Sequence, residues 1–185
     1  MKVVCFGDSN TWGYDPRGFW GDPYEEIWPV LLAQMTGWTV INWGENGREI
    51  PSAEIAFPKD MDLLILMLGT NDLLHCGDAD RVSQKMERFL QCINVTREKI
   101  LLISPPHMRS GTWVMDSKLI NESAVMTVNF HSLSQKLGIR FADAEAWGIT
   151  IAYDGVHFSE YGHHAFAWGL TSYLSKELGI CWKKE

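Results

Sequence analysis

The chain has 185 residues, a formal net charge of −7, and 46% hydrophobic against 21% charged residues. Such a composition is typical of a folded globular protein, and the length favours one domain spanning residues 1–185. No basic run stands out along this acidic chain, so we expect no nucleic-acid partner.

The run Met1–Phe6 leads straight into the first polar motif and leaves no room for a signal peptide. No apolar stretch approaches the roughly 18 residues that a membrane span needs. We therefore expect a cytoplasmic protein without a membrane partner. The four cysteines form no CxxC pair and are expected to be reduced thiols: Cys5, Cys76, Cys92 and Cys181.

Short runs that are apolar or rich in β-formers predict strands, and several of them end at glycine or proline. In chain order these strands are Val3–Phe6, Trp38–Trp43, Leu63–Leu68, Ile100–Ile103 and Arg140–Ala142. Between them the apolar residues recur at helical spacing, and most of these patterns stop at glycine. The predicted helices are Tyr24–Met35, Asp80–Val95, Asp116–Leu137 and Glu160–Leu178.

Strand and helix alternate along the whole chain, which favours a parallel sheet covered by helices on both faces. We expect an α/β protein with a flavodoxin-like three-layer α/β/α sandwich and about five strands. The irregular stretches Gly13–Asp22 and Pro105–Val114 each carry Trp and Arg and are candidates for shaping a pocket.

Polar residues follow several of the predicted strands, and the carboxyl ends of parallel strands are where ligands bind in such folds. These segments are Gly7–Asn10, Gly44–Gly47, Gly69–Asp72 and Asp154–His157. A serine hydroxyl needs a base within hydrogen-bond reach, and that base needs an orienting acid. Ser9, His157 and Asp154 supply these types and predict a catalytic triad.

The oxyanion that forms during acyl transfer needs hydrogen-bond donors. We expect the backbone N–H groups of Ser9 and Gly44 and the side-chain amide of Asn71 to serve as these donors. Asp8 and Asp72 are interpreted as residues that shape their loops, although Asp8 is also a candidate contact to substrate.

The four polar segments, taken in order, resemble the conserved blocks of the SGNH (GDSL-like) hydrolase family. Asn10 departs from the apolar residue that usually follows the GDS of its first block. Phe6–Tyr14, Arg48 and Leu66–Asp72 are most similar to the arylesterase and acetyl-xylan esterase subgroup. The resemblance implies a serine esterase that acts on acetyl or short acyl esters, with no metal and no cofactor.

The candidates for binding the small-molecule substrate are Asp8, Asn10, Trp12, Arg48 and Trp113, although Arg48 is also able to brace the oxyanion loop. Among the nine tryptophans, four in predicted loops are equally compatible with a pocket wall and with packing: Trp12, Trp20, Trp113 and Trp147. Core or interface positions are expected for Trp38, Trp43 and Trp168. Together with the subgroup resemblance, this excess of tryptophan predicts a homo-oligomer.

Other functions remain open at this stage, and a metal site is disfavoured. A thioesterase or lysophospholipase of the same fold would need a longer acyl pocket, and a non-catalytic homologue would bind a ligand without turnover. A metal site at His163 and His164 is disfavoured, because adjacent helical residues diverge by about 100 degrees.

Overall fold

The computed structural model describes residues 1–18 and 21–179 and contains a five-stranded sheet in which every pairing is parallel. The strands are β1 (Lys2–Gly7), β2 (Thr39–Gly44), β3 (Leu63–Met67), β4 (Ile100–Ser104) and β5 (Arg140–Asp143). Their order in the sheet is β2-β1-β3-β4-β5. This order is the flavodoxin-like one, so the predicted fold class is confirmed.

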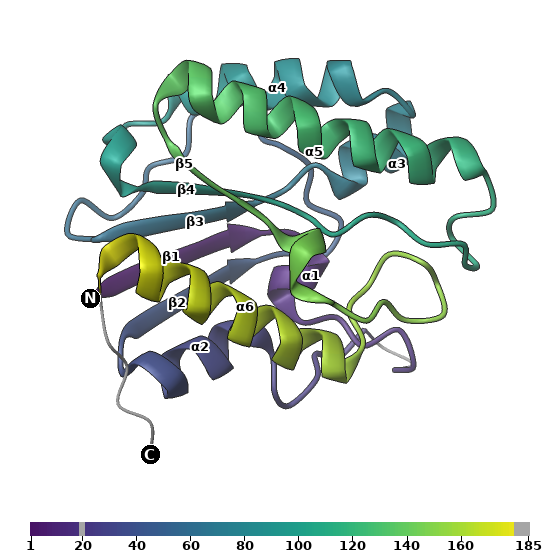
Figure 1. Cartoon of the computed structure of the whole chain (residues 1–185), viewed down its shortest axis with the longest axis horizontal. Coiled ribbons are helices and arrows are strands. Elements are labelled where there is room, and N and C mark those ends of the chain that lie inside the picture. Colours follow the sequence, from purple (N-terminus) through teal and green to yellow (C-terminus); the bar gives the residue numbers. More distant parts are fainter. Residues whose placement is uncertain (19–20, 180–185) are drawn as a thin grey trace.

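Helices cover both faces of the sheet (Figure 1). The α-helices are α1 (Ser9–Trp12), α2 (Trp28–Thr36), α3 (Thr70–Cys76), α4 (Ala79–Cys92), α5 (Ser117–Leu137) and α6 (Glu160–Leu178). Two 3-10 turns, Arg97–Lys99 and Ala144–Trp147, precede β4 and follow β5. One layer holds α3, α4 and α5, and the opposite layer holds α2 and α6.

Successive side chains of a strand point to opposite faces of the sheet, so the strands contribute to two hydrophobic cores, one on each face. In β1, Val4 and Phe6 face the layer of α4 and α5, whereas Val3 and Cys5 face α2 and α6. The central strands β3 and β4 are buried along their whole length, as expected for parallel strands covered on both sides. The sheet is therefore a rigid support for the loops at its carboxyl edge.

Several boundaries differ from the sequence-based expectation. The helix predicted to begin at Tyr24 begins at Trp28, because the Tyr24 N–H pairs with Gly13 O and Pro29 occupies the first turn, where no donor is required. The short helices α1 and α3 were not predicted. The strand at Trp38–Trp43 is an edge strand and is only partly buried.

Trp20 and Cys181, for which the sequence analysis made predictions, lie outside the described residues. The other three cysteines are free thiols. Within the described part of the chain, no helix is long and apolar enough to cross a membrane.

Strands β1 and β3 are neighbours, although their connections leave in opposite directions along the sheet. Such a switch point opens a crevice at the carboxyl edge of the sheet. In Figure 1, α1 lies at this edge, at the end of β1. β3 ends at the same edge, because its last residue, Met67, pairs with Gly7 at the end of β1. The segment that follows β3 therefore begins there. The chain thus brings the first and third polar segments to one place.

Candidate active site

Ser9, His157 and Asp154 form a continuous hydrogen-bonded chain. Ser9 Oγ lies 2.9 Å from His157 Nε2, and His157 Nδ1 lies 2.7 Å from Asp154 Oδ2. All three side chains are buried. The neutral imidazole with its proton on Nδ1 donates to the carboxylate and leaves Nε2 to accept the serine hydroxyl proton.

The acid and the base are held together within one short loop. Asp154 Oδ1 accepts the backbone N–H groups of Val156 and His157, each at 2.9 Å. Burial alone would raise the pKa of Asp154, but the hydrogen bonds from the His157 side chain and from these two N–H groups outweigh burial and lower it. The carboxylate is therefore ionised when it orients the imidazole.

Two aromatic rings flank the imidazole of His157. The Tyr14 ring lies 4.5 Å away in a tilted arrangement, and the Trp113 ring meets the imidazole edge-on at 5.0 Å. Trp113 is 53% exposed, so part of its surface is accessible to a ligand. Tyr14 was not selected from the sequence, although it closes the segment Phe6–Tyr14 that carried the resemblance.

The stretch Pro105–Val114 supports the triad loop through its backbone. Three N–H groups donate to consecutive carbonyls: Arg109 to Gly155 at 2.9 Å, Trp113 to Asp154 at 3.0 Å, and Thr112 to Tyr153 at 3.3 Å. A Cβ on Gly111 would lie 2.3 Å from the Asp154 carbonyl carbon, so only glycine fits there. This predicted pocket-shaping loop therefore also fixes the position of Asp154.

Asn71 lies at the start of α3 and holds the loop that follows β2. Its Nδ2 donates to Arg48 O at 3.0 Å, which uses one of the two amide protons. The Arg48 guanidinium caps the sheet edge by donating to Gly7 O at 3.0 Å and to Trp43 O, and it pairs with Glu45. These contacts match the bracing alternative for Arg48.

The structure gives the Gly44 N–H a different acceptor from the expected oxyanion. This N–H donates to Asn42 Oδ1 at 2.8 Å, because the Asn42 side chain folds back along the edge strand. Gly44 instead permits close packing, since a Cβ there would lie 2.1 Å from Trp12 N. Among the described residues, the N–H of Gly47, next to Arg48, has no acceptor, and its positive φ of 74° suits glycine.

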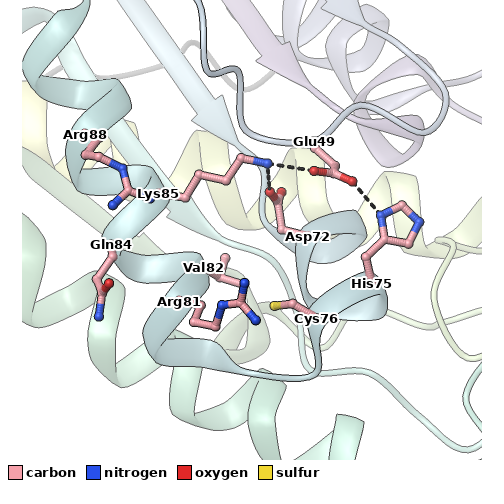
Figure 2. Close-up of a pocket in the computed structure, with 9 residues that line it drawn as sticks. All are labelled: Glu49, Asp72, His75, Cys76, Arg81, Val82, Gln84, Lys85 and Arg88. Carbon is pink, nitrogen blue, oxygen red and sulfur yellow. Dashed lines mark hydrogen bonds and ion pairs between the residues drawn. The ribbon is translucent and has the colours of Figure 1, made fainter.

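A pocket of about 250 Å³ lies between α3 and α4, and no member of the triad lines it (Figure 2). Lys85 bridges two carboxylates there, with Nζ at 2.5 Å from Asp72 Oδ1 and 2.6 Å from Glu49 Oε2. Asp72 Oδ2 accepts the Ile50 N–H at 2.9 Å. This network anchors the end of the loop that Asn71 also holds.

Two of the candidate substrate contacts lie beneath the site and not in its wall. Asp8 and Asn10 are almost completely buried. Asp8 Oδ1 accepts the Asn10 N–H at 3.0 Å and caps α1, which begins at Ser9. Burial raises the pKa of Asp8 to about 6, although the Asn10 N–H, His157 and Thr70 act in the opposite direction.

The tryptophans separate into groups that the sequence did not distinguish. Trp12 and Trp113 are exposed, so both remain candidates for the pocket wall. Trp147 instead packs edge-on against Phe166 at 5.1 Å in the core below α6. Trp168, expected in the core or an interface, is 65% exposed on α6.

His163 and His164 point in different directions. His163 is buried between Tyr24 and Phe158, and burial lowers its pKa to about 3. His164 pairs with Glu26 at 3.1 Å. In the described ranges, no group of three or more His, Cys, Asp or Glu side chains is placed to hold a metal ion.

Comparisons with known proteins agree with the fold. Residues 5–165 match the model of the GDSL-like lipase/acylhydrolase family. The chain is similar to a carbohydrate acetylesterase family member from Sinorhizobium meliloti, with 27% identity and a TM-score of 0.81 over 97% of this chain and 100% of that one. It is also similar to a protein from Agrobacterium tumefaciens assigned as an arylesterase, with 28% identity and a TM-score of 0.78 over 95% and 99%. The aryl esterase of M. smegmatis, at 21% identity and a TM-score of 0.79 over 95% and 99%, shares the fold. No curated protein matches the sequence.

The buried carboxyl of Asp8 gives a prediction for stability. The folded protein binds this proton more tightly than the unfolded chain, because the pKa is about 6 in place of 3.8. The parent therefore loses stability as the pH rises from about 4 to 6, and the loss remains above pH 6. Asp8→Asn keeps the Oδ1 acceptor without the charge. We expect it to gain up to about 3 kcal/mol relative to the parent between pH 4 and pH 7, measured by urea unfolding.

Asp22→Asn, at an exposed carboxyl, is the matched control and should change stability by less than about 0.5 kcal/mol at both pH values. If the difference in unfolding free energy between Asp8→Asn and the parent does not vary with pH, the buried charge of Asp8 does not destabilise the folded protein.

Proposed function

The chain belongs to the GDSL-like lipase/acylhydrolase family and is an esterase, and on this premise we propose that Ser9 is its nucleophile, His157 its general base and Asp154 the orienting acid. The observation that carries the proposal is the unbroken chain Ser9 Oγ, His157 Nε2, His157 Nδ1, Asp154 Oδ2, with contacts of 2.9 and 2.7 Å. A serine without such a base is a weak nucleophile at neutral pH.

The reaction proceeds through an acyl-enzyme. Ser9 Oγ attacks the ester carbonyl while its proton moves to His157 Nε2, and collapse of the tetrahedral intermediate releases the alcohol, which takes that proton. Water then repeats the sequence on the Ser9 ester and releases the carboxylic acid. Asp154 remains ionised throughout and stabilises the transient imidazolium, in agreement with its lowered pKa.

We assign the role of oxyanion donor to three groups: the Ser9 N–H, the second Asn71 amide proton and the Gly47 N–H. The first two keep the sequence-based expectation, and Gly47 replaces Gly44, whose N–H is bonded to Asn42. Asn71 and Gly47 lie close together, because Asn71 holds the carbonyl of the residue after Gly47 at 3.0 Å. These donors are fixed before substrate arrives, which is the condition for efficient stabilisation of the transition state.

The proposed substrates are acetyl or other short acyl esters of sugars or aryl alcohols. The exposed Trp113, beside His157, offers a flat surface on which a sugar or aryl leaving group stacks. The similar proteins from S. meliloti and A. tumefaciens are a carbohydrate acetylesterase family member and a protein assigned as an arylesterase, which supports this substrate class.

The triad is tested by covalent labelling. A fluorophosphonate probe should modify Ser9, because His157 accepts the hydroxyl proton as the Ser9 oxygen attacks the phosphorus. Mass spectrometry of the digested protein identifies the labelled residue. The variants Ser9→Ala and His157→Ala should remain folded by circular dichroism and be unlabelled; label on another residue would contradict the assignment.

Asn71→Ala tests the oxyanion site. Because this interaction strengthens as charge develops on the carbonyl oxygen, kcat should fall by roughly 10²–10³ while KM changes little. Steady-state kinetics on a nitrophenyl ester measure both constants.

The Ala substitution also removes the bond to Arg48 O, so a control that loosens the same loop is required. Lys85→Met breaks the anchor through Asp72 and keeps the Asn71 amide. It should lower Tm with a much smaller loss of kcat. Equal losses of kcat in the two variants would mean that Asn71 acts only by holding the loop.

Acyl preference is the third test. We expect higher kcat/KM for acetyl and propionyl than for decanoyl esters in a nitrophenyl series, and higher rates on acetylated sugars or aryl acetates than on acyl thioesters. A preference for the decanoyl ester or for thioesters would instead favour the lysophospholipase or thioesterase alternative.

A further inference from the structure

Asn10 is a polar side chain with 3% exposure, placed directly after the nucleophile. Its carboxamide is used at both ends: Nδ2 donates to Val156 O at 3.2 Å, and Oδ1 accepts the Phe158 N–H at 2.8 Å. The two bonded residues lie immediately before and after His157. We propose that Asn10 is a positioning residue that clamps the imidazole of His157 against Ser9, an inference that rests on the proposed roles of those two residues.

The clamp is itself fixed from two sides. The Asn10 N–H donates to Asp8 Oδ1 at 3.0 Å, and Trp28 Nε1 donates to Asn10 O at 3.0 Å. Trp28 is fully buried and packs against Phe166 at 4.7 Å. The backbone of Asn10 is therefore tied to the core beneath α1, and its carboxamide transmits that position to the loop.

The triad loop needs such a clamp because its two ends are held differently. Residues 153–155 accept three N–H groups from the Pro105–Val114 stretch. Asp154 and His157 are joined to each other by side-chain and backbone bonds, which hold them as one unit without tying that unit to Ser9. Within the loop, the Ala152 N–H also holds the His157 carbonyl at 2.7 Å. Asn10 ties Val156 and Phe158 to α1, the helix that carries Ser9. Its loss therefore lets this end of the loop, with the imidazole, shift relative to Ser9.

An apolar replacement gives the expected kinetic effect. Asn10→Leu removes both bonds and leaves Val156 O and the Phe158 N–H without their partner. Because small displacements of reacting groups are costly, we expect kcat to fall by about 10²-fold, with KM within about twofold of the parent. The rate of fluorophosphonate labelling of Ser9 should fall by a similar factor, because labelling uses the same proton transfer without the leaving-group step.

A matched control separates positioning from general stability. Thr36, at the end of α2 and the opposite edge of the sheet, also makes one donated and one accepted bond to backbone, to Leu32 O at 2.6 Å and from Trp38 N at 3.2 Å. Thr36→Val should lower Tm while kcat and the labelling rate stay within twofold of the parent.

Asn10→Asp provides a second readout through pH. The neutral carboxyl reproduces the donor and the acceptor of the amide, but the ionised carboxyl has no proton for Val156 O. The ratio of variant kcat to parent kcat should therefore be near one at acid pH and fall as the pH rises. The ionisable groups around this position are Asp8, Asp154, His157 and His163, which are the same in both proteins. Circular dichroism at each pH confirms that both are folded.

The outcomes distinguish this inference from the proposed function. Activity retained in Ser9→Ala would overturn both. If Ser9→Ala is inactive while Asn10→Leu and Asn10→Asp keep kcat within twofold of the parent at all pH values, only the clamp is wrong. The clamp is also wrong if Asn10→Leu loses no more kcat than Thr36→Val, or if the Asn10→Asp ratio does not change with pH. A selective loss in Asn10→Leu with a falling Asn10→Asp ratio supports it.

Discussion

The hydrogen bond between Ser9 Oγ and His157 Nε2 joins residues that are 148 positions apart, and neither residue is able to form it through its own local structure. Ser9 is placed by β1, an interior strand of a sheet with helices on both faces. His157 is placed by a loop with no strand of its own, which depends on backbone bonds from the Pro105–Val114 stretch and on Asn10. The surrounding contacts hold the end of β1 and the loop of His157 within hydrogen-bond distance of each other.

Three buried carboxylates near this bond show how environment decides charge. Asp154 has three hydrogen-bond donors and a lowered pKa. Asp72 forms an ion pair with Lys85 and accepts a backbone N–H, and these two contacts anchor a loop. Asp8 Oδ2 is buried and has no hydrogen-bond partner in the described part of the chain, and burial raises the pKa of this carboxyl. The same residue type thus orients a base, fixes a loop and caps a helix within one edge of the sheet.

Much of the fold was predictable because its strands are short apolar runs that end at glycine or proline, and the structural neighbours match the subgroup implied by the sequence. Ser9 was selected because it directly follows β1, and polar residues after parallel strands gather at one edge. Asp154 and His157 lie well beyond the end of β5, and they were selected by residue type and by their three-residue spacing. Gly44 was not distinguishable from Gly47, because the folding of Asn42 onto its N–H leaves no pattern in the chain. Likewise, the packing of Trp147 and the exposure of Trp168 depend on the tertiary arrangement of α6. The contact between Tyr14 and His157 depends on how the loop after α1 turns.

Residues 109, 112 and 113 hold the carbonyls of residues 153–155 through main-chain N–H groups. Any amino acid except proline supplies such a group, so evolutionary drift is free to exchange the side chains at these three positions without releasing Asp154. Gly111 is the exception, because a Cβ there collides with the loop it supports. Homologues are therefore expected to diversify substrate preference in this stretch, at the position of Trp113 above all, while one glycine and the path of the backbone stay invariant.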